Sequence, residues 1–452
     1  MEIANEYEFR RGICQLLKKN AHEDDDDGAN AKDIENLVSL GLSMSITTTG
    51  SVCIFEIPDI PRGQNQKAYV PIAFSIGPRH HDSPKLSAND KLRTLYTRDL
   101  ISKDRNPKAT LTELSKTNLY SSSTEFCQKV QECYPQHFHL EFYIRPYLFF
   151  DGCFIIELLH KFQDQNRRDP DDPVFSYMLQ FLYHDLILLQ NQIPWFVLED
   201  IFDRTSGIND KPLLWHVSAL LKRIFPIAFV PAKGNLPSQQ PKHILDLLRI
   251  WLVSPIEEET RQNIVVQRDD VLAYGGWKPI PPATFLRKAG VKLKRKSKAD
   301  SILQVTFRNG YLEIPPLEFR QGTEAIFRNL ICLEQCLSNC PHGITSYVAL
   351  MGCLINSTMD FDLLCEAGIF DNWKNPEDVS NFFNKAIYPG AYVKDYYYLE
   401  LSKQVNEYCH RGCPRLLAIF RNEFTPPWAI ISLIVAGFLF IFTLLQTVCH
   451  NE

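Results

Sequence analysis

The sequence predicts a mainly α-helical fold, in which a large helical body with a small β hairpin is followed by one C-terminal transmembrane helix. The chain has 452 residues, of which 45% are hydrophobic and 22% charged. These values are close to those of an average globular protein, and the chain is long enough to bury a large core. Most apolar residues recur at helical spacing, and one alternating stretch indicates strands. One long run without charge lies near the C-terminus and is typical of a membrane span.

The first 40 residues are expected to form an acidic, mobile arm ahead of the helical domain, which we place at residues 41–425. The arm contains the run Glu23–Asp27, whose like charges repel one another. It has no long apolar segment of the kind that a secretory signal requires. Prolines then punctuate residues Val52–Ser75. Because proline cannot donate to a sheet, we expect extended segments packed on the helices there.

Two strongly apolar stretches are expected to supply core helices. Residues Phe142–Phe162 form the first, and we predict a break at Asp151–Gly152, because glycine weakens a helix. Residues Phe175–Phe202 have the spacing of two buried helices. We expect these helices to meet at Asn191–Pro194, since proline removes a backbone donor and clashes with the preceding turn.

A β hairpin is predicted within residues 291–317. The string SILQVTF alternates, so that Leu303, Val305 and Phe307 share one face. Asn309–Gly310 is the favoured dipeptide of a type I′ turn, which joins two antiparallel strands. Helical patterns resume after the hairpin and continue towards the C-terminal span.

Two polar segments precede the hairpin. Glu257–Ala273 follows a helical pattern at residues 243–253, is itself poorly periodic, and is expected to be a mobile insertion. Arg287–Lys298 holds seven cations in twelve residues. Its alternation with Val291 and Leu293 favours an exposed strand whose charges face outward and whose lysines protect a sheet edge. The alternative is a contact with phosphates or with an anionic membrane surface.

The predicted transmembrane helix covers residues 426–448 and leaves a short tail at 449–452. Residues Trp428–Val448 read WAIISLIVAGFLFIFTLLQTV, without one charged side chain. At 1.5 Å per residue this run is about 31 Å long, which matches a hydrocarbon core of ~30 Å. Trp428 stands where an interfacial aromatic residue belongs. A buried core helix is the alternative, and the length argues against it.

The flanking cations predict the orientation of the span. Arg411, Arg415 and Arg421 precede it, and no lysine or arginine follows it. The positive-inside rule therefore places the large N-terminal part in the cytosol. A span this near the C-terminus would insert after synthesis, as in a tail-anchored protein. The expected partner is a lipid bilayer, and both the plasma membrane and the endomembranes stay open.

The common catalytic motifs are absent from the sequence. We find no G-x-x-x-x-G-K-[ST], G-x-G-x-x-G, G-x-S-x-G or H-E-x-x-H. The sequence therefore predicts no cofactor, no small-molecule ligand and no enzyme activity. The net charge of -5 does not favour nucleic-acid binding. Protein partners of undefined identity remain the expected ligands of the helical body.

One cysteine cluster has weak features of a metal site. Spacing of four places three thiols on roughly one helix face, with a histidine close behind them. Structural zinc sites more often use C-x-x-C turns, so we favour a buried helix face with small side chains. The candidate ligands are Cys332, Cys336, Cys340 and His342. A looser group of similar weight comprises Cys133, His137 and His139.

Histidines and aspartates suggest a metal-dependent hydrolase as a further alternative. Such an enzyme needs several of them to converge, and the candidates are His80–Asp82 with His184 and Asp185. Asp185 lies in a very apolar run, so a carboxylate hydrogen-bonded in the core is favoured over a ligand. Asn191 and Gln192 beside the helix break are interpreted as caps that satisfy freed backbone groups.

Several ordered strings together resemble one plant family, domain of unknown function 247, also called uncharacterised protein family 0481. They include AYVPIAFSIGPRHH, DGCFIIELL, DLILLQNQIPWFVLEDIF, FRNGYLEIPPL, FRNLICLEQC and the apolar tail. The resemblance spans roughly residues 45–448 and implies a single C-terminal transmembrane helix. It implies no catalytic activity or cofactor, and some grass members are implicated in pollen self-incompatibility. This chain has Gln190 where the family usually has glutamate and Trp195 where phenylalanine is usual.

The sequence thus favours a C-terminally anchored plant membrane protein that recognises or signals through protein partners. A pollen self-recognition determinant and an unrecognised metal-dependent hydrolase are the two alternatives.

Overall fold

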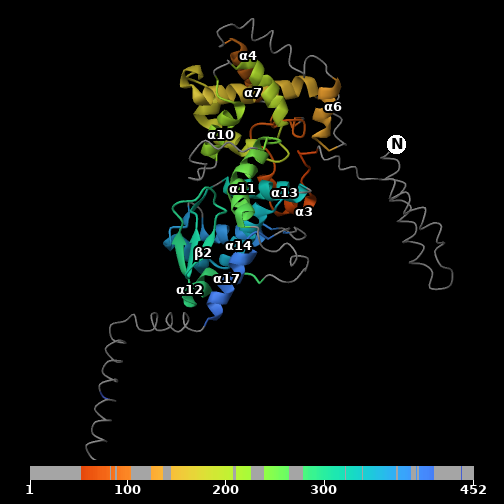
Figure 1. The fold of residues 1–452 in the computed structure, drawn as a ribbon. Coiled ribbons are helices and arrows are strands. Elements are labelled where there is room, and N and C mark those ends of the chain that lie inside the picture. The colour runs from red at the N-terminus through yellow and green to blue at the C-terminus, as the bar shows by residue number, and fades with distance from the viewer. Residues whose placement is uncertain are drawn as a thin grey trace, which may run out of the picture. The chain divides into compact units, whose positions relative to one another are not determined.

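The fold is described by a computed structural model. It covers residues 52–81, 83–86, 89–102, 124–135, 144–206, 210–224, 239–263, 278–320, 322–337, 340–372, 375–387, 393, 396–411 and 439. The expected N-terminal arm lies outside these residues, as do the short tail and the expected span except for Leu439. The architecture is mainly helical with two small sheets, as predicted for the body (Figure 1).

The first group of helices is built around α7 (Ile144–Gln163). Helices α4 (Asp90–Ser102), α9 (Trp195–Thr205) and α10 (Leu213–Ile224) all pack against it. The stretch of α7 from Cys153 to Leu159 is buried throughout. A helix that is apolar on every side belongs inside a core. The composition of this segment therefore explains why other helices surround it.

Helix α7 is continuous, and the predicted break at Asp151–Gly152 is wrong. A Cβ added to Gly152 would lie 2.3 Å from the Cδ1 of Ile201 on α9. Glycine therefore lets the two helices approach closely, and the packing gained outweighs its low helix propensity. Asp151 is also accommodated, because Arg93 of α4 lies 3.0 Å from its carboxylate.

The helix pair predicted on either side of residues 191–194 is confirmed. A π-helical turn, η5 (Val174–Met178), runs into α8 (Leu179–Leu186). Pro194 then serves as the N-cap residue of α9. Proline suits that position because its missing N–H would be unpaired in the first turn of a helix.

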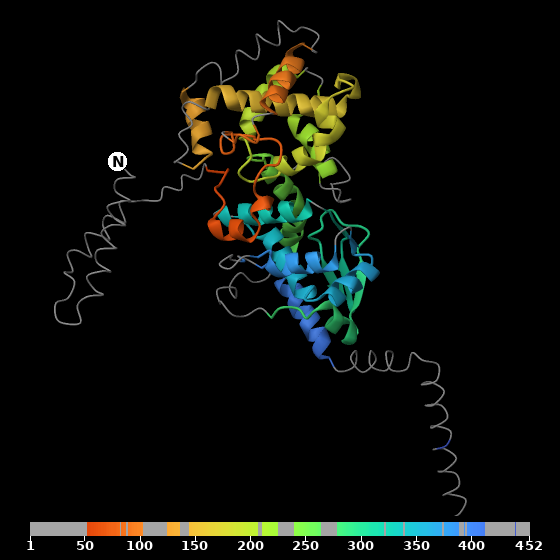
Figure 2. The same cartoon turned by 180° about the vertical axis from the view of Figure 1, so that it is seen from behind.

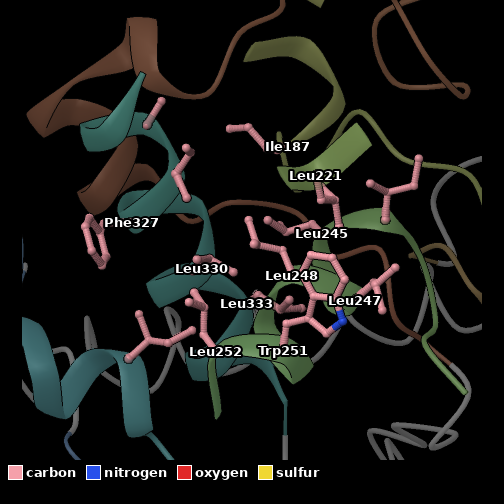
Figure 3. Packing of buried hydrophobic residues seen from close by; sticks show 14 of the residues in the cluster. Ile187, Leu221, Leu245, Leu247, Leu248, Trp251, Leu252, Phe327, Leu330 and Leu333 are labelled. Carbon is pink, nitrogen blue, oxygen red and sulfur yellow. The ribbon is translucent and has the colours of Figure 1, made fainter. Parts of the chain in front are cut away.

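A second group of helices carries the apolar contacts that Figure 3 shows. Helix α11 (Ile244–Asn263) contacts both α13 (Thr323–Cys336) and α14 (Gly343–Leu354). Leu245, Leu248 and Leu252 of α11 lie near Leu330 and Leu333 of α13. These side chains recur at intervals of three or four residues, as the helical pattern predicts.

Two expectations drawn from the sequence are corrected, the second of them only in part. Residues 257–263 continue α11 through Pro255, whereas we expected a mobile insertion from Glu257 to Ala273. Residues 264–273 lie outside the described part. In the proline-punctuated segment, the chain forms α3 (Asp59–Gln64) and the 3₁₀ turn η1 (Gln66–Ala68). Pro61 is tolerated there because the first turn of a helix needs no donor from it.

The predicted hairpin is confirmed by strands β2 (Thr306–Arg308) and β3 (Tyr311–Ile314). Asn309 and Gly310 have φ of 52° and 79°, which is the conformation of a type I′ turn. Strand β1 (Lys292–Arg295) lies parallel to β3 and gives the sheet order β1-β3-β2. Residues 292–295 of the basic segment therefore form an edge strand, as one of the two interpretations predicted, whereas Arg287 and Lys288 lie in a helix.

The remaining elements complete the region around the sheets. A second sheet pairs two parallel strands, and four helices pack close by. The two strands are β4 (Leu317–Phe319) and β5 (Phe370–Asn372), and the four helices are α12 (Ala283–Lys288), α15 (Thr358–Glu366), α16 (Pro376–Lys385) and α17 (Leu399–His410). Two further elements lie earlier in the chain, α6 (Thr124–Glu132) and the 3₁₀ turn η4 (Gln165–Arg167). All elements from Cys53 onward belong to one unit.

Among the described residues, no single helix has both the length and the hydropathy needed to cross a membrane. Helices α14 and α15 pass that test only as a pair, and they meet at a bend of 105°.

Candidate functional site

A buried carboxylate holds an extended segment on the helical body. Asp185, at the end of α8, accepts hydrogen bonds from the backbone N–H groups of Ile72, Ala73 and Phe74 at 2.7, 2.8 and 2.7 Å. Its side chain is fully buried. A charged acceptor with three donors compensates the loss of hydration that burial imposes. Residues 71–77, which we call the clamped segment, are thereby fixed to α8.

Further side chains bind the same segment. Asn191 accepts from the N–H of Ile76 at 2.8 Å and donates to the carbonyl of Phe74 at 3.0 Å. Asp151 of α7 accepts from the N–H of Gly77 at 2.7 Å. These contacts satisfy backbone groups that no helix or strand satisfies. The string AFSIG and the string LLQNQIP therefore form one structural unit.

The predicted capping roles of Asn191 and Gln192 are confirmed. Asn191 also donates to the carbonyl of Asp185 at 2.9 Å. Gln192 donates to the carbonyls of Leu186 and Leu188 at 2.6 and 2.9 Å. Its Oε1 accepts from the N–H of Leu245 at 3.3 Å. The two amides thus occupy the carbonyls freed where α8 ends.

The residues proposed for a metal-dependent hydrolase form a different arrangement. His184 lies beside Asp185, with Nδ1 3.0 Å from its carboxylate. Burial, together with the positive charges of neighbouring Arg79 and Arg62, lowers the pKa of His80 to about 4. His80 is therefore neutral at pH 7. Asp185 is engaged by three backbone donors, and Asp82 lies outside the described residues.

Within the described part of the chain, no group of three or more His, Cys, Asp or Glu side chains is arranged to hold a metal ion. The hydrolase alternative therefore gains no support from the placement of His80, His184 and Asp185. The contacts of Asp185 are those of a structural clamp.

The three cysteines and the histidine proposed as zinc ligands likewise do not converge, and Cys332, Cys340 and His342 each contact a different partner. Cys332 contacts the hydroxyl of Tyr69 at 3.8 Å, and Cys340 accepts from Arg249 at 3.3 Å. His342 Nδ1 lies 3.3 Å from the side-chain amide of Gln335. The structure does not bring the candidates Cys332, Cys336, Cys340 and His342 together as a metal site.

The thiols of this cluster are protonated at neutral pH. Burial raises the pKa of Cys332 to about 12 and that of Cys336 and Cys340 to about 11. Zinc binds thiolates, which such burial disfavours. In the second group, His137 and His139 lie outside the described residues. Cys133 is buried and hydrogen-bonded to the carbonyl of Lys129.

Sequence reasoning missed a buried charge cluster between α4 and α7. Lys161 lies 2.9 Å from both Asp99 and Asp172. The hydroxyl of Tyr96 donates to Asp172 at 2.9 Å, and the Lys161 ammonium stands 4.0 Å from the centre of the Tyr96 ring. Buried charges need such partners. These residues are spread from position 96 to position 172, so no short stretch of sequence indicates that they pair.

A second missed group lies at the start of α14. Glu334 of α13 accepts from the N–H groups of Ile344 and Thr345 at 2.9 and 2.8 Å, and from the Thr345 hydroxyl at 2.6 Å. Glu334 of α13 therefore caps the N-terminus of the next helix, α14. Burial raises its pKa to about 7, although these donors oppose the rise. The one available signal was a glutamate inside the apolar run ICLEQC.

A basic surface on the three-stranded sheet is exposed to solvent. Lys292 and Lys294 of β1 are exposed on one side of the strand, while Leu312 of β3 is buried. Their ammonium groups lie 4.9 and 5.9 Å from the ring centre of Tyr311. Lys294 pairs with Glu313 at 2.8 Å. These contacts leave most of the positive charge facing solvent.

Of the three residues predicted to set membrane topology, only Arg411 is among the described residues. Arg411 is exposed just after α17, whereas Arg415, Arg421 and the anchor residues Trp428 and Val448 lie outside the described residues.

Beside α17, a cavity of about 240 Å³ is lined by Lys278, Leu399, Ser402, Lys403, Asn406, Glu407 and His410.

The fold and these clamps define a mainly helical protein in which buried side chains such as Asp185, Asn191 and Glu334 bind backbone groups. The family model described as "Plant protein of unknown function" matches residues 54–442. The chain therefore belongs to the plant family domain of unknown function 247, which confirms the resemblance drawn from the sequence.

Two Arabidopsis thaliana proteins are similar to this chain over most of their length. UPF0481 protein At3g47200 is 29% identical, over 88% of this chain and 86% of its own. Putative UPF0481 protein At3g02645 is 22% identical, over 74% of this chain and 78% of its own. No solved structure matches the chain.

Proposed function

We propose that this protein is a plant membrane protein, anchored by residues 428–448, whose helical body binds protein partners in the cytosol without catalysis. The observation that carries the anchor is the run of 21 residues from Trp428 to Val448, which holds no charge. Its length suits a bilayer, and its aromatic start suits an interface. The cations Arg411, Arg415 and Arg421 on its N-terminal side favour a cytosolic body.

The non-catalytic part of the proposal is supported by how the buried polar groups are used. Asp185 and Asn191 bind backbone donors more than 100 residues earlier in the chain, and Glu334 binds those at the start of the next helix. Catalytic groups need access to a substrate and freedom to exchange protons. Side chains that hold the main chain in this way are poorly suited to that task.

The anchor is tested by extraction of the full chain from plant membranes at alkaline pH. The chain should stay with the lipid, whereas a variant with both Ile434→Arg and Phe438→Arg should be released. Two arginines near the bilayer centre cost several kcal/mol. A matched variant with Asn422→Arg and Thr425→Arg, outside the apolar run, should stay bound. Release of the wild-type chain would refute the anchor.

The orientation is tested separately by protease protection of sealed membranes. An epitope on the N-terminus should be digested without detergent, and one on the C-terminus should be protected. Proximity labelling from the N-terminus should then recover cytosolic proteins. Recovery of lumenal or extracellular neighbours alone would contradict the proposed orientation.

A self-recognition role in pollen is the sharper form of this proposal, and it comes from the family resemblance. It predicts that the transcript is present in pollen. A transcript confined to leaves or roots would contradict it.

A further inference from the structure

The edge of the three-stranded sheet carries a surplus of positive charge. Between Lys292 and Ile314 there are six cations and two acids, Asp300 and Glu313. Five of the cations are exposed: Lys292, Lys294, Arg295, Lys298 and Arg308. We call Lys292, Lys294 and Arg308 the basic face, because the strand register puts these three on one side of the sheet. Glu313 neutralises one cation by its contact with Lys294. A clear positive excess is left on the surface.

The strand register explains why these charges gather. Lys292 pairs with Tyr311, and Tyr311 pairs in turn with Arg308 on β2. Residues that are paired across a sheet point to the same side. One side of the sheet therefore carries cations around the half-exposed ring of Tyr311, while Leu312 and Ile314 face the core.

The same sheet lies beside the helix that leads to the expected span. Tyr408 of α17 packs against Phe307 of β2, with ring centres 5.6 Å apart. A Cβ added to Gly310 would meet the Tyr408 hydroxyl, and the carbonyl of Gly310 accepts from the N–H of Lys292 at 2.8 Å. Figures 1 and 2 both show α17 alongside the sheet.

Chain length then limits how far the sheet can stand from the bilayer. Helix α17 ends at His410, and 17 residues separate it from Trp428. Even fully extended, such a linker spans at most roughly 60 Å. An anchored molecule therefore holds its basic face at a high effective concentration near the lipid surface.

From this placement we infer that the basic face docks onto the anionic lipid headgroups of the membrane that anchors the chain. The inference rests on the proposed function, since it requires the anchor and a cytosolic body. Headgroup phosphates and carboxylates complement the charge, and the cytosolic leaflet carries anionic lipid. The ring of Tyr311 suits an interface because it is apolar with a polar tip. Docking would fix the orientation of the helical body on the membrane.

The experiment places the full chain in nanodiscs of neutral phosphatidylcholine, or of the same lipid with about one third phosphatidylserine. Hydrogen exchange of residues 287–298 and 306–314 is measured in both. Docking should slow exchange of these segments in the anionic discs, and 0.5 M salt should reverse the effect because it screens the charges. Exchange of the α7 peptides should not change.

The variant carries Lys292→Gln, Lys294→Gln and Arg308→Gln. Each cation near an anionic surface contributes about fivefold, so the ratio of docked to free molecules should fall on the order of 100-fold. The matched control replaces three exposed lysines elsewhere, with Lys211→Gln, Lys222→Gln and Lys385→Gln. The control should keep the lipid-dependent protection.

The outcomes separate the two proposals. A chain that does not insert into neutral discs refutes the anchor. A chain that inserts but shows the same exchange in neutral and anionic discs overturns the docking inference. The lysines would then protect the sheet edge or meet an acidic protein. Protection that survives in the triple variant would overturn it as well.

Discussion

Replacement of Asp185 tests whether the clamped segment is held by one carboxylate. The substitution Asp185→Asn keeps the shape but removes the charge and one acceptor oxygen. Three backbone N–H groups, those of Ile72, Ala73 and Phe74, point at the native carboxylate. The amide can serve at most two of them with its oxygen, and its NH₂ group faces the third donor.

The structure sets the size of the expected loss. A buried donor without a partner costs about 1–3 kcal/mol, and the bonds that remain lose their charge assistance. We therefore expect Asp185→Asn to lower the unfolding free energy by about 3 kcal/mol. Asp185→Ala leaves three donors unpaired and should cost about 5 kcal/mol. For a unit of about 400 residues, 3 kcal/mol corresponds to a fall in Tm of roughly 4 °C.

The assay is thermal unfolding of the full chain in detergent micelles, combined with hydrogen exchange of residues 71–77. Exchange of this segment should speed up more than that of α13, because the clamp acts locally. The exposed Asp362 on α15 provides the control, and Asp362→Asn should shift Tm by less than 1 °C. A shift of less than 1 °C for Asp185→Asn, with unchanged exchange of the segment, would refute the reasoning.

Three further predictions concern glycine, the departure at Gln190 and a buried acid. Gly77→Ala should cost about 3 kcal/mol, because φ is +76° and its Cβ would lie 2.5 Å from a main-chain oxygen. Gly63→Ala has open space and should stabilise α3 by up to ~1 kcal/mol. Chemical unfolding of both glycine variants measures these changes. Gln190→Glu should add about 1 kcal/mol through Arg62, whose Nη2 lies 3.3 Å away; the gain should vanish with Arg62→Gln. Burial raises the pKa of Glu334 from 4.5 to about 7. The folded state therefore keeps a proton that the unfolded state releases. The unfolding free energy of wild type relative to Glu334→Gln should fall by up to ~3 kcal/mol between pH 4.5 and 7, and a flat difference would contradict this.

Local chemistry explains which parts of the fold could be predicted. The turn at Asn309–Gly310 requires positive φ at two adjacent positions, which asparagine and glycine adopt readily. Pro194 separates two helical patterns because proline has no N–H to donate within a helix, and this loss does not matter at a helix start. The helical pattern of α13 and the basic edge strand β1 also follow from spacing within a few residues. In each case the signal and the structure occupy the same short segment.

The errors arose where a distant element decided the outcome. Gly152 reads as a helix breaker, but Ile201 of α9 packs against it and keeps α7 continuous. Residues 257–263 look polar and irregular, yet they extend α11. Helix propensities differ by at most about 1 kcal/mol per residue outside proline, so packing between elements overrides them.

The candidate sites show the same division. Sequence spacing placed Cys332 and Cys336 near one another, but it could not show that Cys340 faces Arg249. It recognised Asp185 as a buried acid that needs hydrogen bonds. The partners of that acid, about 110 residues earlier in the chain, were beyond its reach.

By itself, the sequence determined the family, the helical class, the hairpin and the charge-free run, because each depends on residue order along a short or continuous stretch. The tertiary structure decided which charges are buried in pairs, which acids hold backbone, and that the sheet containing the basic strand lies beside the helix that leads to the expected anchor. Those relations depend on distances between residues far apart in the chain, and such distances are fixed only when the core packs.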